Sequence, residues 1–225
     1  MNYLVTGGAG FIGSHITDRL LADGHTVRIL DNFSTGKHEN IPAAPEVEVI
    51  EGDVGDFETV RHAMQGIDYV FHEAAIASVP ETVGDPLASE RVNYRGTLNI
   101  LETARHAGVR RVVFACSAAV YGDLPELPKR EDMPLRPLSP YAVSKVAQDM
   151  LAYQYFRSYG LKTIRTRGFN HTGPRRGDVF VASNFARQIV SIEAGLQEPV
   201  IRVGNLDARR DFTDVRDMVR GYWLA

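Results

Sequence analysis

Short apolar runs that read as buried strands alternate along this chain with longer segments of helical periodicity. The strand-like runs are NYLVT, TVRIL, VEVIEGD, DYVFHEAA, RRVVFACS and LKTIRT, and helices are expected over residues 57–65, 86–107 and 140–159. Strands that alternate with helices form βαβ units and therefore a parallel sheet. Strands that are apolar almost throughout are typical of a sheet covered by helices on both faces. The pattern predicts an α/β fold built on a doubly wound parallel sheet.

The first strand-like run leads directly into a glycine-rich turn, TGGAGFIGSH. Gly7, Gly10 and Gly13 occupy every third position of this turn, and an amphipathic helical pattern follows them. Such glycines allow a tight turn and let the backbone approach a pyrophosphate at the positive N-terminus of the helix. Asp31 stands eighteen residues after Gly13, at the end of the next strand, where a carboxylate accepts hydrogen bonds from a ribose 2′-hydroxyl. The spacing predicts a dinucleotide-binding site.

Asp31 also bears on which dinucleotide binds. Its carboxylate would repel a 2′-phosphate, and the next residue is Asn32 rather than an arginine. We therefore expect NAD rather than NADP, although Lys37 is close enough in the sequence to keep NADP as an alternative.

The segment SPYAVSK places Tyr141 and Lys145 four positions apart on a predicted helix, and hence on one of its faces. A phenol ordinarily loses its proton only at about pH 10, but a neighbouring ammonium stabilises the phenolate. A tyrosine and lysine so placed can act as a general base. Ser117 follows a predicted strand and can hydrogen-bond the same substrate oxygen.

Taken together, these features resemble the extended branch of the short-chain dehydrogenase/reductase superfamily, whose members modify nucleotide sugars. The resemblance spans essentially the whole chain and rests on TGGAGFIG, Asp31-Asn32, GDV at 52–54, HEAA at 72–75, Asn93, Ser117, YAVSK and RGFNHTGP. It implies a Rossmann-type sheet, NAD as the cofactor and a nucleotide-diphosphate sugar as the substrate. It also implies a homodimer that pairs through the helices expected at 86–107 and 140–159.

The resemblance implies roles for individual residues as well. The catalytic residues would be Ser117, Tyr141 and Lys145. The cofactor contacts would be Gly7, Gly10, Phe11, Ile12, Gly13, Asp31, Asn32, Phe33, Ser34, Thr35, Gly36, Asp53, Val54, Ala74, Ala75, Ala77, Asn93, Tyr141, Lys145 and Phe169. The substrate contacts would be Ser78, Ser117, Tyr141, Asn170, Asn184 and Arg210.

The composition changes after Asn170. A polar loop, HTGPRRGD, is followed by a helical pattern over 180–194 and by another in the last residues, DVRDMVRGYWLA. Following the resemblance, we expect residues 1–170 to form the NAD-binding Rossmann domain and residues 171–225 to begin the nucleotide-sugar-binding lobe. Because members of the family continue well beyond this point, we expect an incomplete C-terminal substrate lobe.

Two alanines, Ala118 and Ala119, directly follow Ser117 and bear on the choice of reaction. The family's sugar chemistry usually starts with oxidation at C4 to a 4-keto sugar. A 4,6-dehydratase then needs an additional acid/base pair, and members with that activity carry acidic residues at these two positions. Because an alanine transfers no proton and a 4-epimerase needs no further group, we expect a nucleotide-sugar 4-epimerase with Tyr141 as its base.

The two halves of the chain differ in what they resemble. Residues 1–164 are similar to UDP-hexose 4-epimerases, whereas the remainder looks more like GDP-mannose dehydratases and GDP-4-keto-6-deoxymannose reductases. The nucleotide, UDP or GDP, therefore stays open. A 4,6-dehydratase or a 4-keto-6-deoxyhexose reductase is the alternative enzyme, and a non-catalytic NAD-binding protein is the alternative outside enzymes.

Composition argues against several other classes of protein. A net charge of −3 is unlike a general nucleic-acid binder, which usually shows a basic excess. The chain has no apolar run long enough to span a membrane and no basic signal-peptide start, so no membrane partner is expected. The single cysteine, Cys116, fits a cytoplasmic location and is interpreted as a small core residue. No metal is expected, because the histidines form no ligand set.

Overall fold

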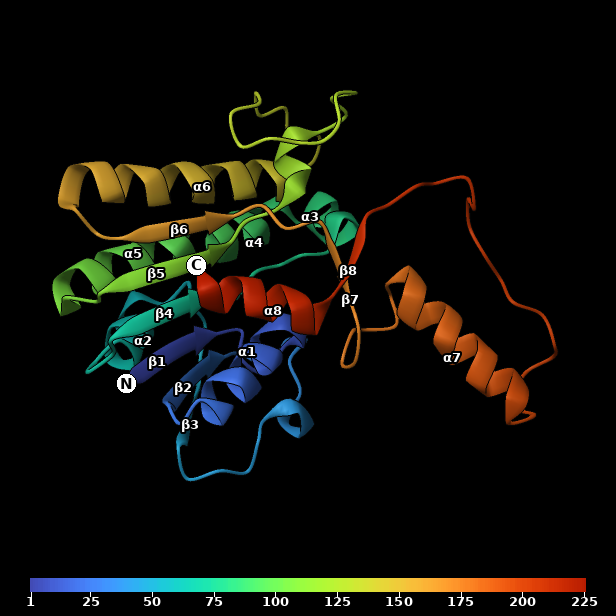
Figure 1. Cartoon of the computed structure of the whole chain (residues 1–225), viewed down its shortest axis with the longest axis horizontal. Coiled ribbons are helices and arrows are strands. Elements are labelled where there is room, and N and C mark those ends of the chain that lie inside the picture. The colour runs from blue at the N-terminus through green and yellow to red at the C-terminus, as the bar shows by residue number, and fades with distance from the viewer.

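The computed structural model describes all residues, 1–225, and has a six-stranded parallel sheet at its centre (Figure 1). The strands are β1 (Asn2–Thr6), β2 (Thr26–Asp31), β3 (Val47–Glu51), β4 (Tyr69–His72), β5 (Arg111–Ala115) and β6 (Thr163–Thr166). Their order in the sheet is β3-β2-β1-β4-β5-β6. The chain therefore winds outward from β1 to one edge and from β4 to the other, which confirms the doubly wound sheet.

Helices cover both faces of this sheet. One face packs against α2 (Phe57–Ala63), α5 (Gly96–Ala107) and α6 (Pro140–Tyr159). The other face packs against α1 (Phe11–Ala22) and α8 (Val215–Leu224) (Figure 1). The sheet is therefore the middle layer of three.

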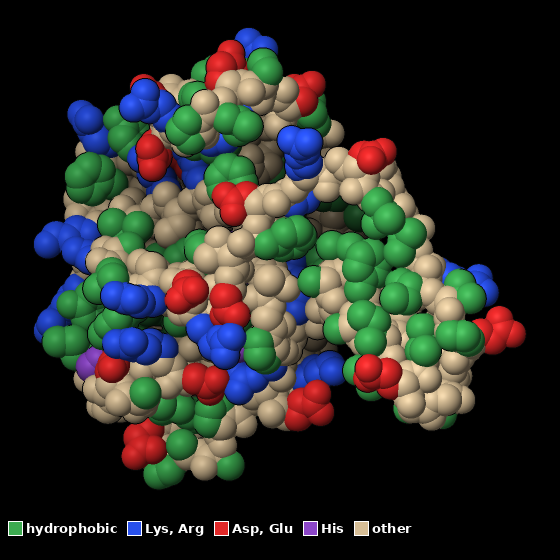
Figure 2. Space-filling view, turned by 45° about the vertical axis from the view of Figure 1, so that its right-hand side comes forward, with side chains coloured by type: hydrophobic (Ala, Val, Ile, Leu, Met, Phe, Trp, Pro, Cys, Tyr) green, Lys and Arg blue, Asp and Glu red, His purple; other side chains and the backbone are tan.

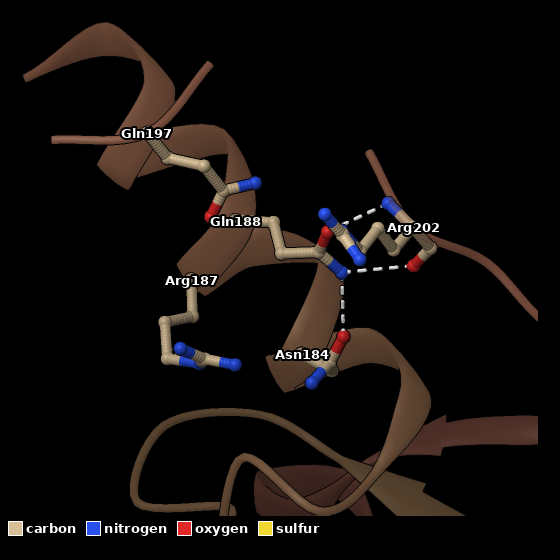
Figure 3. Close-up of a pocket in the computed structure, with 5 residues that line it drawn as sticks. All are labelled: Asn184, Arg187, Gln188, Gln197 and Arg202. Atoms are coloured by element: carbon tan, nitrogen blue, oxygen red, sulfur yellow. Dashed lines mark hydrogen bonds between the residues drawn. The ribbon is translucent and has the colours of Figure 1, made fainter. Parts of the chain in front are cut away.

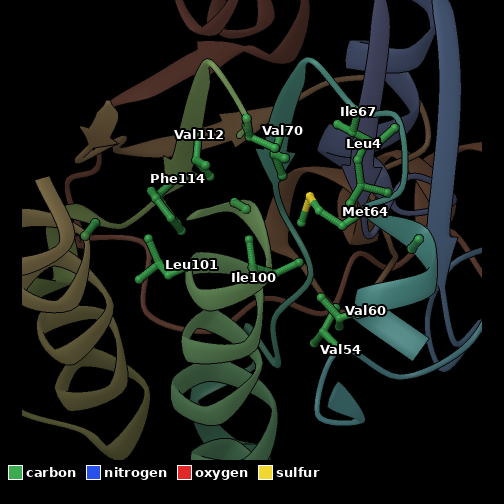
Figure 4. Close-up of a cluster of buried hydrophobic side chains, with 14 of the residues drawn as sticks. Leu4, Val54, Val60, Met64, Ile67, Val70, Ile100, Leu101, Val112 and Phe114 are labelled. Atoms are coloured by element: carbon green, nitrogen blue, oxygen red, sulfur yellow. The ribbon is translucent and has the colours of Figure 1, made fainter. Parts of the chain in front are cut away.

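Alternation along the strands divides the apolar side chains between two cores, because successive residues of a strand point to opposite sides. In β1, Leu4 belongs to the core on the α5 side, shown in Figure 4, whereas Tyr3 and Val5 belong to the core on the α1 side. In β5, Phe114 belongs to the core on the α5 side and Val113 to the core on the α1 side. Burial on both faces explains why the strands read as continuous apolar runs.

Local signals set the bounds of two expected helices. The helix expected at 140–159 is α6; the Ser139 hydroxyl caps its N-terminus, and Gly160 ends it with a positive φ of 72°. The helix expected at 57–65 is α2, which the Asp56 side chain caps.

The helix expected at 86–107 changes form along its length. It consists of α4 (Pro86–Ser89), a π-helical turn (Glu90–Arg95) and α5. The wide turn carries Asn93, whose side chain reaches the loop that follows β4. Widened turns of this kind are frequent at functional sites.

Two short strands connect the sheet to a smaller lobe. β7 (Asn170–Thr172) pairs in parallel with β8 (Phe212–Asp214). Between them in the chain lies α7 (Val181–Glu193), expected at 180–194, which projects away from the sheet (Figure 1). Figure 2 shows hydrophobic side chains gathered on this lobe. Its most exposed apolar side chains are Val179, Val190, Leu196 and Leu206.

The last helix, α8, returns from the lobe to the sheet. Its Val215, Val219 and Tyr222 share one helical face and are buried in the core on the α1 side. That residues 171–225 begin a nucleotide-sugar-binding lobe stays a prediction. Within 171–225, however, α8 packs as part of the domain that contains the sheet.

The structure of residues 1–225 contains neither a membrane-spanning helix nor a cluster of metal ligands. None of its helices combines the length and the apolarity that crossing a membrane requires. No group of three or more His, Cys, Asp or Glu side chains is arranged to hold a metal ion.

Candidate active site

The glycine-rich turn between β1 and α1 forms a cradle of backbone atoms. Gly7 has a φ of 68°, and a Cβ at this position would lie 2.8 Å from the amide nitrogen of Ala74, in the loop after β4. A Cβ on Gly13 would lie 2.2 Å from the Gly7 carbonyl oxygen, so only glycine allows this close packing. Gly10 begins α1 without a side-chain cap, which leaves the first N–H groups of the helix available to an anion.

Asp31 ends β2 beside this turn and is buried. Its Oδ2 accepts a hydrogen bond from the Ala9 N–H (2.9 Å), and its Oδ1 accepts one from the Phe33 N–H (2.9 Å). Each carboxylate oxygen keeps a second lone pair for a ribose hydroxyl. Lys37, which kept NADP open, pairs with Glu39 at 3.3 Å between Nζ and Oε1. The turn and Asp31 therefore fit a dinucleotide whose ribose carries a free 2′-hydroxyl.

The loop after β2 folds back over Asp31. Asn32 Oδ1 accepts a hydrogen bond from the Ser34 N–H (3.1 Å), and a Cβ on Gly36 would lie 2.9 Å from Asp31 Oδ1. Only glycine at residue 36 leaves the carboxylate this close to the loop. Contacts of these residues and of Thr35 with a cofactor stay a prediction.

Asp53 and Val54 follow β3, at the same edge of the sheet. Asp53 Oδ1 accepts a hydrogen bond from the Gly55 N–H (2.7 Å), and its Oδ2 lies 3.3 Å from Nη1 of Arg91. The Val54 side chain is buried in the core on the α5 side. The cofactor contact expected of Val54 stays a prediction, and its side chain is already packed in this core.

Asn93 fastens the loop that follows β4. Its Oδ1 accepts a hydrogen bond from the Ile76 N–H (2.8 Å), while its Nδ2 donates to the Ile76 carbonyl (3.1 Å) and to Ser144 Oγ on α6 (2.9 Å). The loop carries three of the expected cofactor contacts, Ala74, Ala75 and Ala77. Because these bonds occupy its amide, Asn93 positions the loop, and its direct contact with a cofactor stays a prediction.

Lys145 and Tyr141 lie on α6 beside the C-terminal end of β5. Lys145 is buried, and its Nζ donates hydrogen bonds to the Ala115 carbonyl (2.7 Å) and to Gln148 Oε1 (2.9 Å). An ammonium has three donors, so one N–H remains for a ligand or a phenolate. Nζ lies 5.9 Å from the centroid of the Tyr141 ring. The charge is thus held next to the phenol by the end of the strand.

Ser117 lies two residues beyond β5 and precedes a short 3₁₀ turn (Ala118–Tyr121). Its Oγ accepts a hydrogen bond from the Ala119 N–H (3.1 Å), which leaves the hydroxyl proton free to be donated. The Ala118 N–H donates to the Gly168 carbonyl (2.9 Å) and ties this turn to the chain after β6. The two residues after Ser117, Ala118 and Ala119, have methyl side chains that cannot transfer a proton.

Two titratable groups near these residues are held neutral by burial. Burial raises the pKa of the Cys116 thiol to about 12, which confirms its interpretation as a core residue. Burial lowers the pKa of His72 to about 3. The His72 ring nitrogens lie 2.7 Å from Thr6 Oγ1 and 3.1 Å from Thr97 Oγ1.

Arg176 is a candidate site residue that the sequence analysis did not single out. Its guanidinium lies 3.5 Å from the ring centroid of Phe180 and 4.8 Å from that of Phe11, at the start of α1. Its Nε is buried without a hydrogen-bond partner. The neighbouring Arg175 fixes the loop to α1 through an ion pair with Asp18 (2.7 Å). A buried guanidinium donor beside a helix N-terminus is suited to phosphate oxygens.

The expected substrate residues come from separate elements. Asn170 Nδ2 donates to the Asp211 carbonyl (3.1 Å), and the pairing of β7 with β8 brings Arg210 to the same end of these strands. Arg210 is exposed, and its guanidinium donates to a neighbouring backbone carbonyl. Ser78 caps α3 (Val79–Gly84). The role of each in binding substrate stays a prediction.

Asn184 lines a polar pocket of about 280 Å³ beside α7 (Figure 3). Gln188 Nε2 donates to Asn184 Oδ1 (2.7 Å) and to the Arg202 carbonyl (3.0 Å). Arg187 and Gln197 complete the lining. All five residues belong to the lobe, so this pocket is separate from the end of β5.

Two comparisons with known proteins decide the family. Residues 4–225 match the family model described as GDP-mannose 4,6 dehydratase. The UDP-glucose 4-epimerase of Mycolicibacterium smegmatis is 39% identical over 230 residues, which cover 99% of this chain and 72% of that protein. The chain belongs to the extended short-chain dehydrogenases/reductases that epimerise or dehydrate nucleotide sugars.

Solved structures of this family confirm the Rossmann-type fold. The UDP-glucose 4-epimerase of Thermus thermophilus, in complex with NAD, is 41% identical and superposes with a TM-score of 0.88, covering 100% of this chain and 74% of that one. A dTDP-glucose 4,6-dehydratase from Streptomyces venezuelae, with NAD bound, is 32% identical with a TM-score of 0.90, covering 100% and 71%. The extended family thus includes 4-epimerases and 4,6-dehydratases, two of the three reactions that the sequence left open.

Proposed function

We propose that this protein is an NAD-dependent nucleotide-sugar 4-epimerase that acts through a transient 4-keto sugar. The observation that carries the proposal is the end of β5, where Ser117 is followed by Ala118 and Ala119 and where Lys145 of α6 donates a hydrogen bond to the Ala115 carbonyl. This set of groups serves one oxygen of a sugar and provides no second acid/base pair. The epimerase and NAD complexes among the relatives support the same conclusion.

Each of the three side chains has a defined task in this reaction. Tyr141, as its phenolate, takes the proton of the C4 hydroxyl and later returns it. The positive charge of Lys145 stabilises the phenolate. Hydrogen bonds to the Ala115 carbonyl and to Gln148 hold the ammonium in position. Ser117 donates a hydrogen bond to the C4 oxygen. NAD, when bound, supplies the acceptor and the donor of the C4 hydride.

The cofactor would be held by the cradle between β1 and α1. In this proposal the free N–H groups at the start of α1 and the guanidinium of Arg176 would bind the pyrophosphate, and Asp31 would bind the adenosine ribose. Asn170 and Arg210 are the candidates for the diphosphate of the sugar substrate. The relatives' names favour UDP as the nucleotide, and the family model favours GDP.

A 4,6-dehydratase or a 4-keto-6-deoxyhexose reductase is the second candidate. The description of the matching family and the dehydratase from Streptomyces venezuelae favour it. A dehydratase has to remove the C5 proton and protonate the leaving C6 hydroxyl, and Ala118 and Ala119 do neither. A non-catalytic NAD-binding protein, the remaining alternative, needs no ordered Ser117, Tyr141 and Lys145.

The proposed enzyme is a cytoplasmic homodimer paired through α5 and α6. The surface of α6 exposes Val143, Met150, Tyr153, Phe156 and Tyr159, an apolar set that a second copy would cover. Light scattering of the wild type and of Phe156→Glu tests the pairing. A dimer that becomes a monomer in the variant supports it, and a monomeric wild type contradicts it.

The reaction is tested by giving the protein NAD and, in turn, UDP-glucose, UDP-N-acetylglucosamine and GDP-mannose, with the sugar products followed by NMR. We expect the C4 epimer of one substrate and no net accumulation of reduced cofactor. A new methyl resonance would indicate a 4-keto-6-deoxy sugar and hence a dehydratase. NAD binding without turnover of any of the three would favour the non-catalytic alternative, unless added reduced cofactor is consumed with a 4-keto-6-deoxy sugar, which would indicate the reductase.

A further inference from the structure

Glu73 is a buried acid that the proposed reaction does not use. It directly follows β4, and both oxygens of its carboxylate are buried without a hydrogen-bond partner. Keeping such a carboxylate ionised is costly unless a positive charge compensates it. A polar group left unpaired in this way calls for a partner that the chain itself does not supply.

Ionisable groups on two helices interact electrostatically with Glu73, and one of them is hydrogen-bonded to a histidine on β7. Lys145 approaches from α6 and is the cation that acts on its charge. Tyr222 approaches from α8, and its hydroxyl is 2.8 Å from Nε2 of His171 on β7. The other ring nitrogen of His171, Nδ1, is also buried without a partner, and the charge of Arg176 helps to lower the pKa of this ring. The interior between β4, β7 and α8 thus holds several unsatisfied polar atoms.

The other titratable neighbours of Glu73 carry no positive charge, so Lys145 is the cation that compensates it. Cys116 and His72 are both neutral, for the reasons given above. Tyr141 lies near Tyr222 and Lys145 and carries no positive charge in either form. The ammonium of Lys145 is itself engaged by the Ala115 carbonyl and by Gln148, so it compensates Glu73 only in part.

Burial raises the pKa of Glu73 to about 7, although Lys145 acts in the opposite direction. At neutral pH the carboxyl group is therefore partly protonated in the protein without cofactor. A second positive charge placed nearby would drive that proton off.

The position of Glu73 indicates where that charge comes from. The backbone between Glu73 and Ala74 lies against the Gly7 turn of the dinucleotide cradle, and the charge of Lys145 on α6 acts on the Glu73 carboxylate. The hydride-carrying ring has to lie between the cradle and the tyrosine–lysine pair for the proposed reaction to occur. That ring is cationic in the oxidised dinucleotide and neutral in the reduced one.

We propose that Glu73 is a proton-linked counter-charge for the oxidised nicotinamide: at neutral pH it is partly protonated in the cofactor-free protein and gives that proton to solvent when NAD⁺ binds. The inference rests on the proposed function. Reduced dinucleotide leaves the proton in place, because its ring is neutral. Glu73 therefore favours the oxidised cofactor, and does so more strongly as the pH rises toward neutrality.

Titration calorimetry in buffers of different ionisation enthalpy tests this linkage. At pH 7, NAD⁺ should release about half a proton per site, and reduced dinucleotide none. Between about pH 6 and pH 8 the Kd of NAD⁺ should fall roughly tenfold. In Glu73→Gln the release should disappear and the Kd of NAD⁺ should no longer vary with pH. Glu46→Gln, an exposed acid before β3, is the matched control and should behave as the wild type.

Two results would overturn the inference: wild-type protein that binds NAD⁺ without releasing a proton, or a release that persists in Glu73→Gln. If the protein binds no dinucleotide at all, the proposed function fails and the linkage with it. A ¹³C NMR titration of the Glu73 carboxyl carbon in the wild type is independent of whether the variant folds. Its midpoint should lie near neutrality and move down with NAD⁺; a midpoint at the ordinary value for glutamate contradicts the proposal.

Discussion

Replacing Asp149 by alanine should both destabilise the protein and disturb the candidate active site at the end of β5. The carboxylate of Asp149, on α6, is completely buried and accepts hydrogen bonds from Arg165 Nη1 (2.6 Å) and Arg167 Nε (2.9 Å). Arg167 also donates to the Tyr121 hydroxyl (3.0 Å), in the turn that follows Ser117. The ion pairs thus join α6 to the chain beside the end of β5.

The expected loss in the free energy of unfolding depends on how well water can solvate each arginine once the carboxylate is removed. Removing one partner of a buried ion pair costs about 3–5 kcal/mol. The Arg165 side chain is 31% exposed and can turn to water, whereas that of Arg167 is 12% exposed and keeps two other acceptors. We therefore expect the lower end, about 3 kcal/mol. Tm should fall by roughly 6–12 °C, since 1 kcal/mol corresponds to about 2–4 °C in a domain of this size.

Urea unfolding followed by circular dichroism measures the loss directly. Asp132→Ala, an exposed acid in the loop before α6, is the matched control and should change the free energy of unfolding by less than about 0.5 kcal/mol. A loss in Asp149→Ala as small as that of the control would refute the claim that this carboxylate neutralises two guanidinium groups.

Four further substitutions test separate parts of the account. Tyr141→Phe should lower kcat by about 10²–10⁴-fold while NAD still binds, as rate and titration measurements will show; a wild-type rate excludes Tyr141 as the base. Asp31→Ala should bring the Kd values of NAD and NADP closer together, and equal values already in the wild type would contradict the role of Asp31. Arg176→Met should weaken dinucleotide binding by about 10–100-fold, and an unchanged Kd argues against a phosphate contact. The hydrogen bond from Arg105 lowers the pKa of Glu102 to about 2 from its ordinary 4.5, so Glu102 contributes stability above pH 4.5 that is lost as the pH falls to about 2. In Glu102→Gln the urea midpoint should depend less on pH across that window; an unchanged dependence contradicts the assignment.

Features that depend on local signals were predicted well from the sequence. The helix α6 has the bounds expected of it because a serine cap precedes it and a glycine with positive φ ends it. The glycine turn was recognisable because its spacing is itself the structural requirement: Gly7 and Gly13 pack backbone against backbone. The parallel sheet followed from strands that are apolar on both faces.

Features that depend on contacts distant in sequence were not predicted. The return of α8 to the sheet could not be distinguished from a helix of the lobe, because an apolar face does not indicate which surface covers it. The arginines in HTGPRRGD were visible, but only the fold stacks Arg176 on Phe11. The hydrogen bonds from the Asn93 amide to Ile76 and to α6 also depend on the fold, while its expected contact with the cofactor stays a prediction.

The central claim, that hydride leaves and returns to the same sugar carbon, is tested most directly with a substrate deuterated at C4. UDP-glucose carrying deuterium at C4 is incubated with the protein and NAD, and the product is analysed by NMR and mass spectrometry. We expect the C4 epimer with the deuterium still on C4. Deuterium in a C6 methyl group would show transfer from C4 to C6, which is the dehydratase reaction, and would contradict the account.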